Sequence, residues 1–239
     1  MSHPFTMRRG EAAGIPETRF GKWFLGTNVW RRYVLLEALV ELGRLLGRPD
    51  ERFPCVVDVG CGWGLALPLL AERFRPDRLI GIDLDSDMIE AARGDGCALS
   101  DRTELRVGDA RQLELADGSV DLLFCHQLLH HLREQSRVLA EFHRVLRPGG
   151  VLLLAESCES FISLPWIRLL FRHPMDAQHT ADQYLALVRD AGFEFSRSTV
   201  ATPDPWWSRW DLGLLGQSPA DGPSPLVCVA ATRSSARAS

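Results

Sequence analysis

Continuous apolar runs mark the predicted strands of this chain. The run over residues 55–59 is apolar at almost every position, which is typical of a strand buried on both faces of a parallel sheet. Six further runs predict strands over residues 78–85, 103–110, 120–126, 151–156, 193–200 and 226–231. The pattern therefore predicts a sheet at the centre of the fold.

Amphipathic segments between these runs predict helices. Apolar positions between Arg19 and Leu46 predict one or two helices that end near Gly47-Arg48-Pro49. Four further segments predict helices over residues 65–74, 86–93, 134–146 and 181–191. Strands that alternate with helices indicate an α/β architecture with a mostly parallel sheet.

The first predicted strand leads into a loop with three alternating glycines. Gly60, Gly62 and Gly64 allow a sharp turn and the close approach of a ligand, because no Cβ is in the way. A dinucleotide-binding loop would have the spacing G-x-G-x-x-G, and a Walker loop would end in Gly-Lys-Ser/Thr; this loop has neither. Instead Asp58 precedes the glycines, and an acid at this point suits a ligand that carries an ammonium group.

Two more acidic positions follow predicted strands. Asp83 lies about twenty residues beyond the glycine loop, the separation at which α/β nucleotide folds place a carboxylate on the ribose hydroxyls. Alternatively, Asp83 or Asp85 caps the helix that begins at Ser86, and both roles can hold together. Asp109 ends the third predicted strand, where a surface turn is the alternative to ligand binding.

Five motifs cover the chain in order from Cys55 to Glu156: D-V-G-C-G-W-G, I-G-I-D, G-D-A, D-L-L-F-C-H-Q-L-L-H-H-L and L-R-P-G-G-V-L-L-L-A-E. This set resembles the class I S-adenosylmethionine (SAM)-dependent methyltransferases, and among them the ubiquinone/menaquinone C-methyltransferase-like group (methyltransferase type 11). The resemblance implies a Rossmann-like class I methyltransferase fold, with a mostly parallel seven-stranded sheet, an antiparallel edge hairpin and helices on both faces. It also implies SAM as the methyl donor and S-adenosyl-L-homocysteine as the product.

The resemblance further implies which residues bind the cofactor. An acid and a small residue after the third strand would face the adenine amino group, which implies Asp109 and Ala110 for that contact. The complete set implied for SAM is Asp58, Gly60, Cys61, Gly62, Gly64, Asp83, Leu84, Met88, Asp109, Ala110, Cys125 and His126.

Two residues at the ends of adjacent predicted strands are the catalytic candidates. His126 ends the fourth strand and Glu156 the fifth, so we expect both side chains above the SAM sulfur. We expect His126 to act as a base, with Glu156 as its orienter or as a substrate ligand. Substrate orientation and plain packing are the alternatives for His126. We reject a metal site at His126, His130 and His131, because His126 should end a strand and no Cys or carboxylate completes the set of ligands.

Two apolar segments lie where this fold would place the acceptor. Residues 161–171 follow the fifth strand and residues 206–210 are rich in tryptophan, so we expect them to form a lid over a hydrophobic acceptor. We expect a small apolar or aromatic metabolite that is methylated on oxygen, carbon, nitrogen or sulfur. The residues expected to contact it are Trp23, Trp30, Gln127, His130, Trp166, His179 and Trp206.

The composition of the chain limits which kinds of partner and cellular compartment we expect. The net charge of −4 argues against a surface built for nucleic acid, and no apolar run approaches the ~20 residues that span a bilayer. Six dispersed cysteines without C-x-x-C spacing indicate reduced thiols in a cytoplasmic protein. The first 35 residues carry six Lys and Arg against two Glu, which indicates a solvated basic arm; an anionic substrate or a membrane surface is the alternative partner.

We expect a mobile arm over residues 1–18 and a single methyltransferase domain over residues 19–233. The parts of that domain are a helical cap (19–48), a SAM-binding core (52–156), a lid and acceptor region (157–192) and an edge hairpin (193–233). Two other functions stay open, an RNA methyltransferase and a non-catalytic SAM-binding protein. A monomer and a homodimer are both compatible with the sequence.

Overall fold

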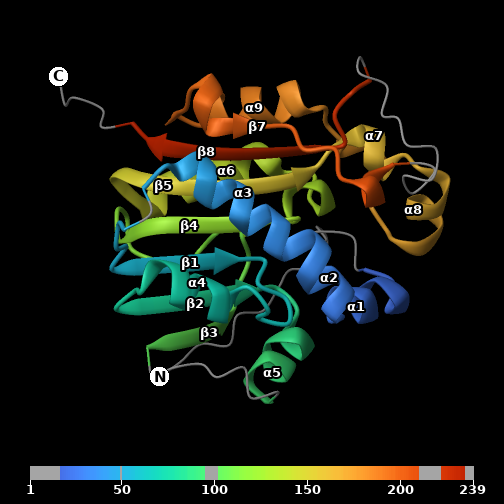
Figure 1. Ribbon diagram of the computed structural model, residues 1–239. Helices are drawn as coiled ribbons and strands as arrows, with labels where there is room; N and C mark the ends of the chain where they lie inside the picture. Colours follow the sequence, from blue (N-terminus) through green and yellow to red (C-terminus); the bar gives the residue numbers. More distant parts are fainter. Residues whose placement is uncertain (1–16, 49, 95–101, 210–221, 235–239) are drawn as a thin grey trace.

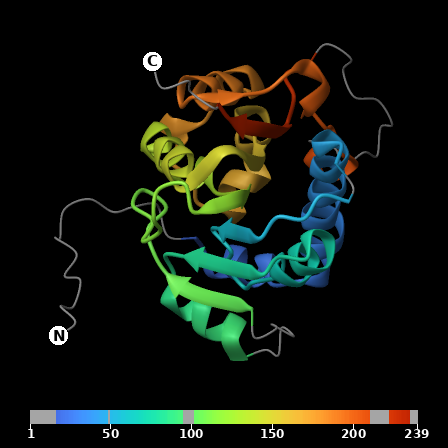
Figure 2. The same ribbon diagram turned by 90° about the vertical axis from the view of Figure 1, so that its left-hand side faces the viewer.

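The computed structural model describes residues 17–48, 50–94, 102–209 and 222–234. These residues form one sheet between two layers of helices (Figures 1 and 2). The arm expected over residues 1–18 falls almost entirely outside the described residues, as do Cys97 and Trp210. Among the described residues, no helix combines the length and the apolar character needed to cross a membrane.

Eight strands build the sheet in the described part of the chain. Their bounds are β1 Cys55–Val59, β2 Arg78–Asp83, β3 Thr103–Val107, β4 Val120–His126, β5 Leu146–Ser157, β6 Phe193–Glu194, β7 Val200–Ala201 and β8 Leu226–Arg233. The order is β3-β2-β1-β4-β5-β8-β6, and β7 pairs with β8 off this path. The first five strands run parallel, and β8 runs antiparallel to its neighbours. The predicted fold class is confirmed.

The predicted strand over residues 193–200 is wrong in its middle, so the sheet has eight strands among the described residues instead of the predicted seven. A 3-10 turn, η4 (Arg197–Thr199), separates β6 from β7. The Ser196 N–H donates to Thr199 Oγ1 (3.1 Å), and the Thr199 N–H donates to the Ser196 carbonyl (3.1 Å). These polar residues satisfy the backbone locally, which competes with pairing to β8.

The N-terminal helical region is a broken run. It comprises α1 (Arg19–Leu25), α2 (Asn28–Trp30), the π-helical turn η1 (Arg31–Leu35) and α3 (Leu36–Leu46). The break before α2 occurs at Thr27, whose Oγ1 accepts from the Trp30 N–H (3.2 Å) as an N-cap. The other helices are α4 Leu67–Phe74, α5 Ser86–Gly94, η2 Leu129–His131, α6 Gln135–Val145, α7 Glu159–Ile162, α8 Pro165–Leu170, η3 Met175–Ala177, α9 Ala181–Asp190 and η5 Trp206–Ser208.

An apolar core covers each face of the sheet. On one face, α3 and α4 pack Leu42, Leu67 and Phe74 against β1, β4 and β5. On the other face, α6 and α9 pack Phe142 and Val188 against the same strands. Figure 2 looks along the sheet and shows the blue and teal helices on one side of it and the yellow and orange helices on the other.

The carboxyl ends of the parallel strands point to one end of the sheet. Helices α1, α2, α7 and α8 lie beyond that end, on the right in Figure 1, although the first pair and the second pair are far apart in sequence. Ligands of open α/β sheets bind in the crevice at the carboxyl ends of the strands. The fold therefore directs the search for a site to this end.

Two residues of α3 test how far the N-terminal region contributes to the core. Leu42 is 0% exposed, whereas Val40, on the same helix, is 69% exposed. We expect Leu42→Ala to lower the free energy of unfolding by about 2–5 kcal/mol, and Val40→Ala to change it by less than about 0.5 kcal/mol. Urea denaturation of the full chain measures both. Equal losses in the two variants would contradict the assignment of α3 to the core.

Candidate functional site

The loop after β1 is built on glycines in the left-handed backbone region. Gly60, Gly62 and Gly64 have φ angles of +80°, +49° and +72°, a region that other residues rarely adopt. The N–H groups of Gly60 and Cys61 both donate to the Ile82 carbonyl, at 2.8 and 3.1 Å. The glycine loop is thereby folded against the end of β2.

Asp83 and Asp85 divide the two roles expected after β2. The Asp83 carboxylate accepts from the Gly62 N–H (2.8 Å) and from the Asp85 N–H (2.9 Å), so it joins the glycine loop to the start of α5. Asp85 Oδ1 accepts from the N–H groups of Asp87 (3.0 Å) and Met88 (3.3 Å). The interpretation of Asp85 as the cap of α5 is confirmed. Asp83 instead bonds to the glycine loop, and its expected contact with a ribose stays a prediction.

Asp58 is the buried acid of the glycine loop. Its side chain is almost fully buried, and Oδ2 has no hydrogen-bond partner in the described part of the chain. Burial, and then the charge of Asp83, raise the pKa of Asp58 to about 8. A cationic group placed beside it would favour the ionised form, so this acid fits a ligand that carries an ammonium group.

A cavity of about 80 Å³ lies against the glycine loop, and we call it the glycine-loop cavity. Its walls are Leu25, Trp30, Leu35, Asp58, Gly60, Cys61, Gly62, Trp63, Leu65, Ala66, Phe124, His126 and Gln127. The N-terminal segment, residues 19–35, is held against this cavity. Trp63 Nε1 donates to the Lys22 carbonyl (3.0 Å), and Lys22 Nζ pairs with Asp85. One wall of the cavity therefore comes from residues that precede the sheet.

Several residues expected to bind the cofactor lie outside these walls. Cys125 is buried in the core with its Sγ 3.9 Å from Glu156 Oε1, and Ala110 packs against the same core. Met88 is buried and Leu84 is exposed. The expected residues that line the glycine-loop cavity are Asp58, Gly60, Cys61, Gly62 and His126, whereas Gly64, Asp83, Leu84, Met88, Asp109, Ala110 and Cys125 do not.

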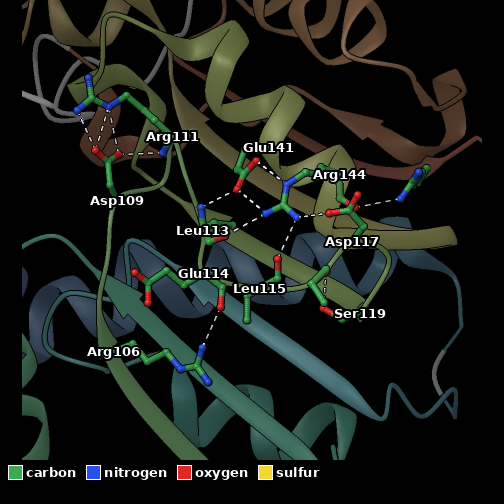
Figure 3. A network of polar contacts seen from close by, with 12 residues as sticks. Arg106, Asp109, Arg111, Leu113, Glu114, Leu115, Asp117, Ser119, Glu141 and Arg144 are labelled. Atoms are coloured by element: carbon green, nitrogen blue, oxygen red, sulfur yellow. Dashed lines mark hydrogen bonds and ion pairs between the residues drawn. The ribbon is translucent and has the colours of Figure 1, made fainter. Parts of the chain in front are cut away.

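Asp109 is held by an arginine at the end of β3 (Figure 3). The Arg111 backbone N–H donates to its Oδ1 (2.8 Å) and Arg111 Nη2 to its Oδ2 (2.8 Å). Burial opposes ionisation, but the hydrogen bonds and charge of Arg111 outweigh it and lower the pKa of Asp109. Arg111 also pairs with Glu134 (3.3 Å) beside α6. Asp109 is therefore an ionised, oriented acceptor.

Glu156 orients His130, so the expectation that it orients His126 is wrong, whereas its alternative role as a substrate ligand stays a prediction. Glu156 Oε2 lies 2.7 Å from His130 Nδ1, and Oε1 accepts from the N–H groups of Leu128 (2.9 Å) and Leu129 (2.7 Å). Both carboxylate oxygens are thus taken by the loop after β4. His130 lies four residues beyond the end of β4, so strand ends alone do not reveal this partner.

His126 ends β4 as predicted, but it has a different environment. Its Nε2 has no hydrogen-bond partner in the described ranges, and its ring lies 6.0 Å from that of Phe124 and 5.7 Å from that of Trp30. Burial lowers the pKa of His126 to about 3. The imidazole is therefore neutral, and a weak base at pH 7.

A second cavity, of about 310 Å³, lies beyond the end of β5, and we call it the aromatic cavity. Its apolar walls are Phe20, Phe24, Leu25, Val29, Trp30, Tyr33, Val34, Phe161, Ile162, Trp166, Ile167, Leu170, Phe171, Trp206 and Trp207. Its polar walls are Glu17, Gln127, His130, His131, Ser157 and His173. Leu25, Trp30 and Gln127 also line the glycine-loop cavity, so the two cavities adjoin.

Most residues expected at the acceptor line the aromatic cavity, and two do not. Trp30, Gln127, His130, Trp166 and Trp206 belong to its walls. Trp23 is 63% exposed, and His179 packs edge-on against Tyr184 with ring centroids 5.3 Å apart; neither lines the cavity. A third cavity, of about 380 Å³, lies against α3 and β8 and also reaches His126 and Gln127.

Sequence reasoning missed several residues of the aromatic cavity, among them Phe20, Phe24 and His173. Phe20 and Phe24 pack their rings against Phe171, each with centroids 5.8 Å apart, which brings α1 to the segment after α8. His173 lies against His130 and His131. The one signal in the sequence was the density of aromatic residues between Phe20 and Tyr33.

The sequence of this chain is similar to those of known methyltransferases. Residues 57–154 match the family model described as a methyltransferase domain. The "Probable S-adenosylmethionine-dependent methyltransferase" of Mycolicibacterium smegmatis is 35% identical over 147 residues, which are 58% of this chain and 51% of that protein. Phosphoethanolamine N-methyltransferase 3 of Arabidopsis thaliana is 29% identical over 180 residues, which are 74% of this chain and 35% of that protein.

A solved structure shares the fold at lower identity. It is a geranyl diphosphate methyltransferase in complex with GPP and sinefungin, with a TM-score of 0.64 and 22% identity over 83% of this chain and 78% of that chain. The chain spans about a third to a half of the length of the curated relatives that head the comparison.

The raised pKa of Asp58 predicts how stability changes with pH. Because the folded-state pKa of about 8 lies above the usual 3.8, the folded state holds this proton more tightly, and Asp58 lowers stability as pH rises from about 4 to 8. Asp58→Asn removes this titration. We expect its free energy of unfolding to gain at least about 1 kcal/mol on the wild type between pH 5 and pH 8.

Urea denaturation at both pH values measures this gain. Asp87→Asn, at an exposed position on α5, is the matched control and should show no such pH-dependent difference. A constant difference between Asp58→Asn and the wild type across this range would show that Asp58 is not a protonated buried acid.

Proposed function

We propose that this chain transfers a methyl group from SAM to a small apolar or aromatic acceptor, since residues 57–154 match the methyltransferase-domain family model. The observation that carries the proposal is that the glycine-loop cavity and the aromatic cavity share Leu25, Trp30 and Gln127. A donor in the first cavity is then adjacent to an acceptor in the second, as an in-line displacement requires.

Four groups of the chain are suited to the parts of SAM. Asp58 would face the ammonium group of the methionyl part, and the backbone of Gly60 and Gly62 leaves room beside it. Asp83, at the end of β2, would accept from the ribose hydroxyls, and Asp109 from the adenine amino group. The glycine-loop cavity, of about 80 Å³, would receive only the methionyl part, since Asp83 and Asp109 lie outside its walls.

The aromatic cavity favours an acceptor that is mostly apolar. Its volume of about 310 Å³ falls within the range of small-molecule pockets, and most of its walls are aromatic or aliphatic. Its charged and imidazole side chains gather at Glu17, His130, His131 and His173, where a polar atom of the acceptor would lie.

The chemistry asks mainly for alignment and a dry site. SAM supplies a sulfonium methyl group, whose positive charge disappears from sulfur as the methyl leaves, so exclusion of water favours the reaction. His130 lines the aromatic cavity with its ring fixed by Glu156, and we infer that it faces the polar atom of the acceptor. The role of His126 as a base stays a prediction. Its lowered pKa makes it a weak base, which counts against that role.

The assignment of Asp83 to the ribose makes a quantitative prediction. Asp83→Ala removes an acceptor for two hydroxyl groups, so we expect SAM affinity to fall by about 1–3 kcal/mol. Isothermal titration calorimetry with SAM measures the change, and circular dichroism checks that the variant is folded. Asp87→Ala, on the exposed face of α5, is the control. Unchanged affinity in a folded Asp83→Ala chain would remove Asp83 from the site.

The proposed function itself is tested by methyl transfer from labelled SAM. The purified chain is incubated with a metabolite extract and, in parallel, with RNA from the same source. We expect label in small apolar compounds and none in RNA. Label in RNA alone would favour an RNA methyltransferase, and SAM binding without any transfer would favour a non-catalytic SAM-binding protein; either outcome contradicts the proposal.

A further inference from the structure

Three histidines from two distant segments meet at one end of the aromatic cavity. His130 and His131 belong to η2, and His173 lies between α8 and η3. The ring centroids are 4.2 Å apart for His130 and His131, 5.1 Å for His130 and His173, and 4.9 Å for His131 and His173. Each ring offers one nitrogen, and these three nitrogens lie within 4.8 Å of one another. We call these three side chains the histidine cluster.

The cluster is not explained by hydrogen bonding among its members. His173 Nδ1 is shielded from solvent and has no hydrogen-bond partner in the described part of the chain. Burial, followed by neighbouring imidazoles, lowers the pKa of all three rings. Neutral imidazoles carry a free lone pair, which is the form that binds metal ions.

One ring of the cluster is already oriented by a carboxylate. Glu156 Oε2 lies 2.7 Å from His130 Nδ1, while Oε1 is fixed by two backbone N–H groups. In the tautomer whose Nδ1–H donates to an ionised Glu156, Nε2 is the nitrogen with the free lone pair. Histidines that bind metals commonly have such a carboxylate partner on the other nitrogen.

The side chain of Gln178 joins the two segments that carry the histidine cluster. Gln178 Nε2 donates both to the His130 carbonyl (2.9 Å) and to the Pro174 carbonyl (2.9 Å). The backbones next to His130 and His173 are therefore tied to one amide group. Such support holds side chains in place before a ligand binds.

Glu17 supplies a carboxylate beside the cluster. Its Oε2 lies 4.0 Å from His131 Nε2, and its Oε1 accepts from the Arg172 N–H (3.1 Å). The carboxylate is partly buried, and burial raises the pKa of Glu17. A nearby cation would favour its ionised form. Glu17 also lines the aromatic cavity with all three histidines.

This donor set selects a class of metal ion. Three imidazole nitrogens and one carboxylate oxygen suit Zn²⁺ and similar first-row ions, whereas Ca²⁺ and Mg²⁺ prefer oxygen ligands. Tetrahedral nitrogens at about 2.0–2.1 Å from zinc lie roughly 3.4 Å apart, so binding would draw the outermost pair of nitrogens closer by up to about 1.4 Å. Rotation about side-chain torsions supplies such a shift.

We propose that His130, His131 and His173, with Glu17 beside them, bind one Zn²⁺-type ion in the wall of the aromatic cavity. The acceptor's oxygen, nitrogen or sulfur atom would bind this ion either in place of the Glu17 carboxylate or as a fifth ligand. This second statement rests on the proposed methyl transfer, whereas the metal site itself does not.

Metal binding is tested on the untagged full-length chain after treatment with a chelator. Zn²⁺ is titrated by calorimetry, and Co²⁺ is added as a probe whose visible absorption reports tetrahedral coordination. We expect one equivalent per chain, and at least about 10-fold weaker binding in His173→Ala. Glu17→Gln should also weaken binding. His179→Ala, a histidine six residues away and outside the cluster, is the matched control and should bind as the wild type does.

The metal site, the role of the metal toward the acceptor and the proposed methyl transfer are each tested by a separate result. No saturable Zn²⁺ or Co²⁺ binding, or equal affinity in the wild type and His173→Ala, overturns the metal site. If the metal binds but the metal-free chain methylates its acceptor equally fast and with the same KM, the role of the metal toward the acceptor is overturned. Absence of SAM binding and methyl transfer would instead refute the proposed function and leave the metal measurements standing.

Discussion

The carboxylate of Glu156 holds together the part of the molecule on which both cavities depend. Its two oxygens engage the backbone of Leu128 and Leu129 and the ring of His130. The residues on either side of it in β5 bind the same loop, because the Ala155 carbonyl accepts from the Gln127 N–H (2.9 Å) and Ser157 Oγ donates to Gln127 Oε1 (2.6 Å).

The contacts from β5 explain an unusual backbone. Gln127 has a φ of +57°, a left-handed conformation that costs a non-glycine residue about 1–2 kcal/mol. The hydrogen bonds from three consecutive residues of β5 offset that strain, and each of the donors that Glu156 accepts from would otherwise be buried without a partner, at about 1–3 kcal/mol apiece. Gln127 consequently stands in the wall between the cavities in a conformation that the loop alone would not favour.

The sequence predicted what depends on local pattern. Residues 120–126 were expected as a strand and form β4 with the same bounds, because a strand buried on both faces is an uninterrupted apolar run. The fold class and the match of residues 57–154 to a methyltransferase domain were also predicted correctly from ordered motifs. The break between β6 and β7 was not predicted, because side chains such as Ser196 and Thr199 bond to nearby backbone without changing the apolar pattern. The histidine cluster and Glu17 depend on packing between segments far apart in sequence, which spacing does not encode.

The shared wall of the two cavities has a thermodynamic consequence. Leu25 and Trp30 border both spaces, and their segment is held against the sheet through Lys22. A compound that displaced this wall from one side would alter the room on the other, and the two occupancies would then be linked. Linkage is reciprocal: whatever factor the first compound applies to the affinity of the second, the second applies to the affinity of the first. One indole group and one isobutyl group would thus couple the contents of the two cavities.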